Sequence, residues 1–364
     1  MDIDELDTPA VIVDLDVMEK NLTRLATYCR EHNLNLRPHT KTHKIPALAC
    51  MQLEHGAIGI TVAKVGEAEV MAACGINDIL VAYPIVTPEK ALRLAALAER
   101  TQISISLDST EAAEVLSKRA REQGVNFSLL VEVDIGFHRC GVSDEKAAVT
   151  LAKTIANLKN VHFSGIMFYP GHMLVKPESQ SALLRPVNES LDRTLSALDR
   201  AGLSARVVSG GSTPTAYRSR EFHGVTEVRP GMYLFNDRNM LGAEVARVSD
   251  CALSVLVTVV SNAVSGRAII DGGSKTFSSD RFLSGDGTGF GLIEEDPQTT
   301  FEAMSEEHGH LNVSRSERRY RIGERIRIIP NHVCTTVNMH HQVYGVRGNR
   351  VEVVWEVAAQ GKLQ

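Results

Sequence analysis

The chain has 364 residues, of which 43% are hydrophobic, so one large domain and a smaller one with sizeable cores are expected. The formal net charge of -5 and the lack of a basic stripe argue against a nucleic-acid partner. No apolar run of about 18 residues predicts a membrane span, and the acidic residues 1–7 do not resemble a secretory signal, so we expect a cytoplasmic protein.

Short apolar runs alternate with segments of helical periodicity through the first two thirds of the chain, a pattern typical of repeated β-α units. The predicted strands are residues 34–37, 58–63, 78–83, 103–107, 128–134, 162–168, 205–209 and 226–228. The predicted helices are residues 66–74, 88–100, 109–123, 144–157 and 180–201. Eight such strands favour a (β/α)8 barrel of the TIM type, and an open doubly wound sheet is the alternative.

The pattern of predicted elements changes near residue 250. Residues 253–260, 268–271, 325–329 and 351–357 have the composition of strands, and no helical segments separate them. The early apolar run 10–15 is a strand that the barrel does not need. We therefore expect a barrel over residues 10–245 and a β-rich domain over residues 246–364, to which residues 1–15 add.

Reactive side chains follow the predicted barrel strands, where the active site of such a barrel forms. Lys41 follows the first strand, and its neighbours His39, His43 and Lys44 offer the cationic surroundings that keep a lysine amine neutral. A solvated basic loop is the alternative. The run Ser209-Gly210-Gly211-Ser212-Thr213 and Gly231 on the next loop suit a phosphate cradle, although glycine-rich turns without ligands are as common. A phosphate site opposite a lysine suggests pyridoxal phosphate (PLP).

Several motifs in order along the chain resemble the D-threonine aldolase and D-serine dehydratase family, which are fold-type III PLP enzymes related to bacterial alanine racemase. They are residues 37–44 (RPHTKTHK), 61–68, 134–141, 209–213, 226–237, 271–275 and 330–334. The resemblance implies an alanine racemase-like barrel followed by a β domain, a homodimer and a small amino-acid substrate. It also implies that Lys41 holds the cofactor, that Arg139 approaches its phenolic oxygen and Arg229 its pyridine side, and that the glycine cradle holds its phosphate. Tyr169, Ser209 and Met232 complete the expected cofactor site.

His332 and Cys334 form a candidate metal pair. We expect them in an extended segment, where alternate residues point to one face. Imidazole and thiolate suit zinc, and the resemblance implies a divalent ion here, with manganese in relatives that have an acidic residue at the second position. His308 and His310 are nearby alternatives that we expect to be loop residues. His172, after the sixth strand, is the candidate base for a substrate hydroxyl, with an ordinary loop histidine as the alternative.

These residues predict a PLP- and metal-dependent lyase that cleaves D-threonine-like β-hydroxy-D-amino acids to glycine and an aldehyde. The alternative is a dehydratase that converts D-serine or 3-hydroxy-D-aspartate to a 2-oxo acid and ammonia. A racemase would need a second base opposite Lys41, and a non-catalytic PLP carrier would lack the second domain, so both are less favoured.

Overall fold

The computed structural model describes residues 1–283 and 288–364. In this part of the chain, eight parallel strands form one sheet in the order β2-β9-β8-β7-β6-β5-β4-β3. They are β2 (Asn35–Leu36), β3 (Ile60–Val62), β4 (Asp78–Val81), β5 (Gln102–Leu107), β6 (Phe127–Glu132), β7 (Val161–Met167), β8 (Val207–Gly210) and β9 (Glu227–Val228). A parallel bridge between His39 and Thr61, just beyond β2 and within β3, brings the two edges of the sheet together. The sheet therefore curls round on itself, which confirms the predicted barrel over the open alternative.

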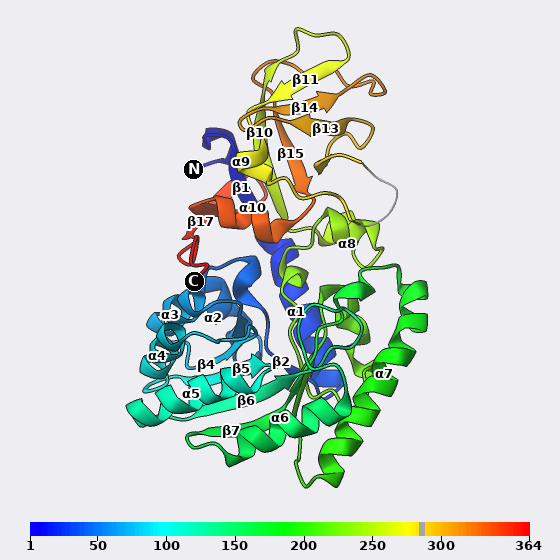
Figure 1. Cartoon of the computed structure of the whole chain (residues 1–364). Coiled ribbons are helices and arrows are strands. Elements are labelled where there is room, and N and C mark those ends of the chain that lie inside the picture. Colours follow the sequence, from blue (N-terminus) through cyan, green and yellow to red (C-terminus); the bar gives the residue numbers. More distant parts are fainter. Residues whose placement is uncertain (284–287) are drawn as a thin grey trace.

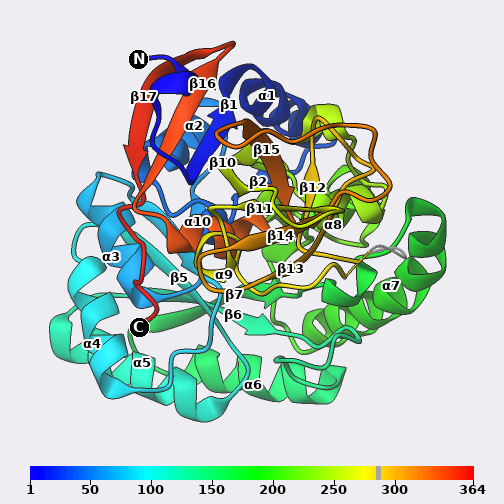
Figure 2. The ribbon, with the colours of Figure 1, turned by 90° about the horizontal axis from the view of Figure 1, so that it is seen from above.

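Helices cover the outside of the curled sheet (Figure 2). The five predicted helices are present as α3 (Val65–Ala73), α4 (Pro88–Leu97), α5 (Thr110–Gln123), α6 (Glu145–Asn157) and α7 (Pro177–Arg200). Among the helices that were not predicted are α1 (Leu15–Glu31) and α2 (Pro46–Glu54). A signal for α1 was present, because Met18, Leu22, Leu25 and Cys29 recur at helical spacing and are all buried. In α2 nearly every residue is apolar or small, so no stripe marks it.

A nine-stranded sheet forms the second layer, in the order β11-β14-β13-β12-β15-β10-β1-β16-β17. Its strands are β1 (Ala10–Asp14), β10 (Leu253–Ser261), β11 (Arg267–Ile270), β12 (Gly291–Ile293), β13 (Thr300–Met304), β14 (Gly309–Asn312), β15 (Arg325–Pro330), β16 (Gln342–Arg347) and β17 (Arg350–Glu356). As expected, the early strand joins this sheet, because β1 pairs antiparallel with β10 and parallel with β16. Strands β12, β13, β14 and β16 were not predicted.

The second sheet stands at one end of the barrel, and the short helix α10 (Val333–Met339) lies between the two (Figure 1). One apolar cluster crosses this junction, because Met18 and Leu22 of α1 pack in the same group as Val255 of β10 and Val333 of α10. One end of the barrel therefore faces α10 and the second sheet, most of which follows the barrel in the sequence. No helix among the described residues has the length and apolar character that crossing a membrane requires.

Close contact between barrel strands gives a test of this packing. Gly165 in β7 has a φ of 153°, and a Cβ there would overlap the carbonyl oxygen of Val207 in β8. We predict that Gly165→Ala lowers the free energy of unfolding by at least about 3 kcal/mol in urea titrations. Gly75→Ala is the matched control, because Gly75 also has a positive φ of 88° but open space around its Cβ, so only about 1 kcal/mol should be lost. Equal losses would contradict the steric explanation.

Candidate active site

A cavity of about 490 Å³ lies where the barrel strands end and α10 covers them. Eleven of the predicted site residues line it, namely Lys41, Arg139, Tyr169, Gly211, Ser212, Thr213, Arg229, Gly231, Met232, His332 and Cys334. Ser209, Gly210 and His172 are not among its lining residues. A cavity of about 600 Å³, lined by residues of β1, β10, β15 and β16, contains none of the predicted residues. The chemistry is therefore concentrated at the barrel mouth.

Lys41 lies in a 3-10 turn, η2 (Thr40–Thr42), directly after β2. The turn is anchored because the Thr40 hydroxyl donates to the Thr61 carbonyl oxygen at 3.1 Å. Lys41 is partly exposed to the cavity, whereas Thr40 and Thr42 on either side are buried. The barrel therefore presents this one amine to the cavity from a fixed turn.

His39, His43 and Lys44 do not give Lys41 the cationic surroundings that were expected. Burial lowers the pKa of His39 well below its ordinary value, and the charges of Lys41 and Arg229 act in the same direction, so this imidazole is neutral. His43 is fully buried on the far side of the turn, with its Nε2 at 3.3 Å from Gln52 Oε1. Lys44 is buried and paired with Glu67. The cations that face the cavity are instead Arg139 and Arg229.

The glycine cradle is present at two neighbouring strand ends. At Gly231 there is no room for a side chain, because a Cβ there would lie 2.6 Å from Thr42 Oγ1 and 2.7 Å from the His39 carbonyl oxygen. Gly211 has a φ of 86°, and Ser212 caps the 3-10 helix η4 (Thr213–Glu221). Gly210 has a packing role beneath the cavity wall, since a Cβ there would overlap the Phe168 ring. The cradle thus offers backbone N–H groups free of side chains, which suits a phosphate.

Arg229 is fixed from below by a chain of buried polar contacts. Its guanidinium donates to Ser209 Oγ at 2.5 Å and to the Phe168 carbonyl oxygen at 2.9 Å. Ser209 donates to Glu227 at 2.5 Å, and Glu227 accepts from Arg37 at 2.7 Å. Burial lowers the pKa of Arg229 to about 10, so it still carries its charge at neutral pH. Ser209 therefore supports the cavity floor through Arg229.

Arg139 and His172 come from neighbouring loops. The Arg139 guanidinium lies 4.7 Å from the centre of the Tyr169 ring and 5.4 Å from that of Phe137. His172 lies in the turn η3 (Gly171–Met173), and its buried Nδ1 has no hydrogen-bond partner among the described residues. Burial lowers the pKa of His172, which leaves its ring neutral and able to accept a proton.

Glu132 was not predicted and is the one carboxylate among the residues that line this cavity in the described chain. It is the last residue of β6 and is buried. Burial raises its pKa, and the charges of Arg229 and Arg139 partly oppose that shift. Sequence position could have indicated it, since it directly precedes the 134–141 motif at a strand end.

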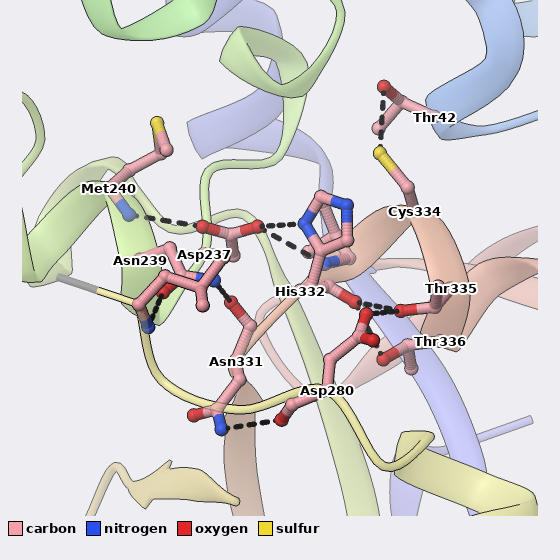
Figure 3. A network of polar contacts seen from close by, with 12 residues as sticks. Thr42, Asp237, Asn239, Met240, Asp280, Asn331, His332, Cys334, Thr335 and Thr336 are labelled. Atoms are coloured by element: carbon pink, nitrogen blue, oxygen red, sulfur yellow. Dashed lines mark hydrogen bonds and ion pairs between the residues drawn. The ribbon is translucent and has the colours of Figure 1, made fainter. Parts of the chain in front are cut away.

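The conformation expected for the metal pair is wrong. His332 is the N-cap residue of α10 and Cys334 lies in its first turn, so both sit at the start of a helix and not along a strand. His332 Nδ1 lies 3.1 Å from Asp237 Oδ2, and the same carboxylate accepts from the Val333 and Met240 N–H groups (Figure 3). Because Asp237 occupies Nδ1, the other ring nitrogen is left for a ligand, which is the usual arrangement behind metal-binding histidines.

Cys334 is the second donor. Its Sγ lies 3.4 Å from Thr42 Oγ1, so the thiol touches the Lys41 turn (Figure 3). Burial alone would raise the pKa of Cys334, but the charge and hydrogen bond of His332 lower it below its ordinary value, helped by Lys41. In His332 burial is outweighed by Cys334 and Asp237, which raise the pKa well above the ordinary value. The two groups stabilise each other as an imidazolium and a thiolate.

This donor set fits a transition metal with open positions. Imidazole nitrogen and thiolate sulfur are ligands that zinc prefers, and an open site leaves room for substrate. No cluster of three or more His, Cys, Asp or Glu side chains with metal-binding geometry occurs in residues 1–283 and 288–364. His308 precedes β14 and His310 lies within it, and neither lines the cavity, so these alternatives are not supported.

Comparisons with known proteins identify the family of the chain. A model of the alanine racemase N-terminal domain matches residues 13–239, and a model of a serine dehydratase domain matches residues 252–346. A D-threonine aldolase of Arthrobacter sp is 32% identical over 98% of this chain and 93% of its own length. A D-threo-3-hydroxyaspartate dehydratase of Delftia sp. (strain HT23) is 35% identical over 91% of this chain and 92% of its own length. The crystal structure of a D-threonine aldolase from Filomicrobium marinum, 32% identical, superposes with a TM-score of 0.94 and covers 99% of this chain and 98% of its own.

The lowered pKa of Cys334 predicts its reactivity. Because the thiolate is the reactive form, Cys334 of metal-free protein should be alkylated by iodoacetamide with a pH midpoint below that of an ordinary thiol. His332→Ala removes the main cause of the shift, so the midpoint should rise. Peptide mapping identifies the modified residue, and Cys334→Ser shows the background. An unchanged midpoint in His332→Ala would contradict the ion-pair explanation.

Proposed function

The chain belongs to the alanine racemase N-terminal domain family, and on that premise we propose that it is a PLP- and divalent-metal-dependent lyase of β-hydroxy-D-amino acids. The reaction that we propose is the retro-aldol cleavage of D-threonine-like substrates to glycine and an aldehyde. The observation that carries the proposal is that Lys41 and the His332–Cys334 pair face one cavity, from the barrel and from α10 respectively.

We propose that Lys41 binds the cofactor through its amine and that Gly211, Ser212, Thr213, Gly231 and Met232 surround its phosphate. Bound PLP withdraws electrons from the α-carbon of an attached amino acid and so weakens the bonds to that carbon. Arg229 offers charged donors and no acceptor to the ring, because its pKa of about 10 keeps it protonated. Arg139, held over Tyr169, faces the same space from the loop after β6.

The metal pair decides what happens at the β-carbon in this proposal. An ion held by His332 and Cys334 would supply a Lewis acid for the substrate hydroxyl. His172, whose ring is neutral, is our candidate for accepting the hydroxyl proton. Removal of that proton leads to cleavage of the carbon–carbon bond, whereas loss of the hydroxyl group leads to dehydration. One site can therefore serve either reaction.

Dehydration of D-serine or 3-hydroxy-D-aspartate, giving a 2-oxo acid and ammonia, is the second candidate. It is favoured by Cys334, since solved structures of the Delftia dehydratase include one variant that replaces a histidine and one that replaces a cysteine, the latter in a metal-free form. The metal that we propose is zinc, with manganese as the alternative. A homodimer is a further proposal from the family resemblance, and sedimentation of the purified protein would test it.

We predict that Lys41→Ala abolishes both the visible absorbance of bound PLP and turnover, because no other amine faces the cavity within the described residues. Parent protein should release glycine and an aldehyde from D-threonine or D-phenylserine. Pyruvate and ammonia from D-serine would select the dehydratase instead. Lys275→Ala, a lysine exposed on the second domain, is the control and should behave as the parent. Undiminished turnover by Lys41→Ala would refute the proposal.

We predict that Asp237→Asn raises the zinc dissociation constant about 10- to 100-fold, because it weakens the hydrogen bond that orients His332. Competition with a chromogenic chelator measures this change. Asp280→Asn is the matched control, since Asp280 accepts from Thr335 in the same network but does not touch the His332 ring (Figure 3). Equal zinc affinity in the two variants would show that Asp237 does not orient the ligand.

A further inference from the structure

Lys44, the last residue of the 37–44 motif, is not among the residues that line the candidate cavity. Lys44 lies three residues after Lys41 but is buried, with a side chain only 5% exposed. Its Nζ lies 3.3 Å from Glu67 Oε1 at the start of α3 and donates to Asn338 Oδ1 in α10 at 2.7 Å. One ammonium group thus joins the Lys41 turn, a barrel helix and the helix that carries Cys334.

The backbone of Lys44 is fixed just as firmly. Its φ of 58° lies in the left-handed region, which a residue with a side chain seldom adopts. Its N–H donates to the Thr40 carbonyl oxygen at 2.7 Å, and its carbonyl oxygen accepts from the Ala359 N–H at 3.1 Å. A glycine would adopt this conformation at less cost, so the side chain offers something that offsets the strain.

Glu67 is held equally well on the other side of the ion pair. Its second oxygen accepts from the Ala63 N–H at 2.7 Å and from the Lys64 N–H at 3.3 Å. The Glu67 side chain is only 2% exposed. A buried carboxylate with these partners is a rigid anchor for the ammonium group, and removing the ammonium alone would leave a buried charge without a counter-ion.

The Lys41 turn and α10 also touch at a second point, where Thr42 Oγ1 lies 3.4 Å from Cys334 Sγ. Asn338 lies one turn further along α10 than Cys334. Two side chains from residues 42–44 therefore contact two residues of α10 that are four apart. Two contacts along one helix fix its rotation as well as its distance, which a single contact would not do.

We propose that Lys44, clamped between Glu67 and Asn338, is a positioning residue that fixes α10, and with it the metal pair, against the Lys41 turn. The inference rests on the proposed function for the roles of Lys41 and of the His332–Cys334 pair. In this arrangement the barrel fixes the position of the Lys41 amine. Lys44 links the Lys41 turn to α10 and so fixes the distance between that amine and the His332–Cys334 pair. Neither Lys44 nor Asn338 needs to touch substrate.

The test removes the link from each side in full-length protein. Asn338→Ala cuts the contact with α10 but leaves the Lys44–Glu67 pair intact. It should retain the visible absorbance of bound PLP, raise the zinc dissociation constant about tenfold and lower kcat with little change in KM. Met339→Ala, the neighbouring truncation on an exposed position of α10, should match the parent. Asn338→Asp keeps an oxygen acceptor and should restore zinc affinity.

From the other side, Lys44→Met combined with Glu67→Gln removes the ammonium group without leaving a buried charge, so it should fold. This double variant should raise the zinc dissociation constant as much as Asn338→Ala does. Adding Asn338→Ala to it should cause no further loss, because both changes remove the same contact.

Three results would overturn the inference. They are additive losses of zinc affinity, an Asn338→Ala variant equal to Met339→Ala, or loss of PLP absorbance in Asn338→Ala. A parent protein that binds no zinc would instead contradict the proposed function. Non-additive shifts in the unfolding midpoint would then still report the clamp between Lys44 and Asn338.

Discussion

The structure depends on one continuous element that links its two parts. Strand β1 lies inside the second sheet between β10 and β16, and α1 continues from it along the barrel. Asp14 makes this junction rigid, because it ends β1 and its carboxylate accepts from the Val17 N–H at the start of α1. With this connection fixed, the sheet can hold α10 over the barrel mouth in a constant position. The candidate site exists only where these two parts meet.

The charged groups of the site also differ between the barrel side and the α10 side. The barrel side carries cations that are balanced from below, since Arg37 bridges Asp78 and Glu227, and Glu227 reaches Arg229 through Ser209. On the α10 side, His332 and Cys334 favour each other's charged forms, and Asp237 supports His332. An anionic cofactor suits the first half and a divalent ion suits the second. Each half is satisfied by its own buried partners, so each can bind its group without rearranging the other.

Much of the barrel could be predicted because buried parallel strands are short apolar runs at regular intervals, and their ends carry the reactive residues. Helix α2 was missed since its composition is apolar on all sides, and β12 to β14 were missed since they are strands of only three to five residues. Local sequence also could not show that His43 turns into the core or that Lys44 meets Glu67. The spacing of His332 and Cys334 predicted that both side chains lie together at the cavity, which they do, but a spacing of two did not reveal that a helix begins there. The role of Asp237 follows only from its contact with His332 across the fold.

The position of β1 has a consequence for biosynthesis. Residues 10–13 (AVIV) are translated long before their partners in β10 and β16, such as Leu256 and Tyr344. Until then this apolar strand has both edges unpaired, which is the condition under which nascent chains associate wrongly. Because β2 to β9 lie between β1 and β10 in the sequence, the barrel can begin to fold while β1 is still unpaired. Chaperone binding to the nascent chain should therefore concentrate on its first strand.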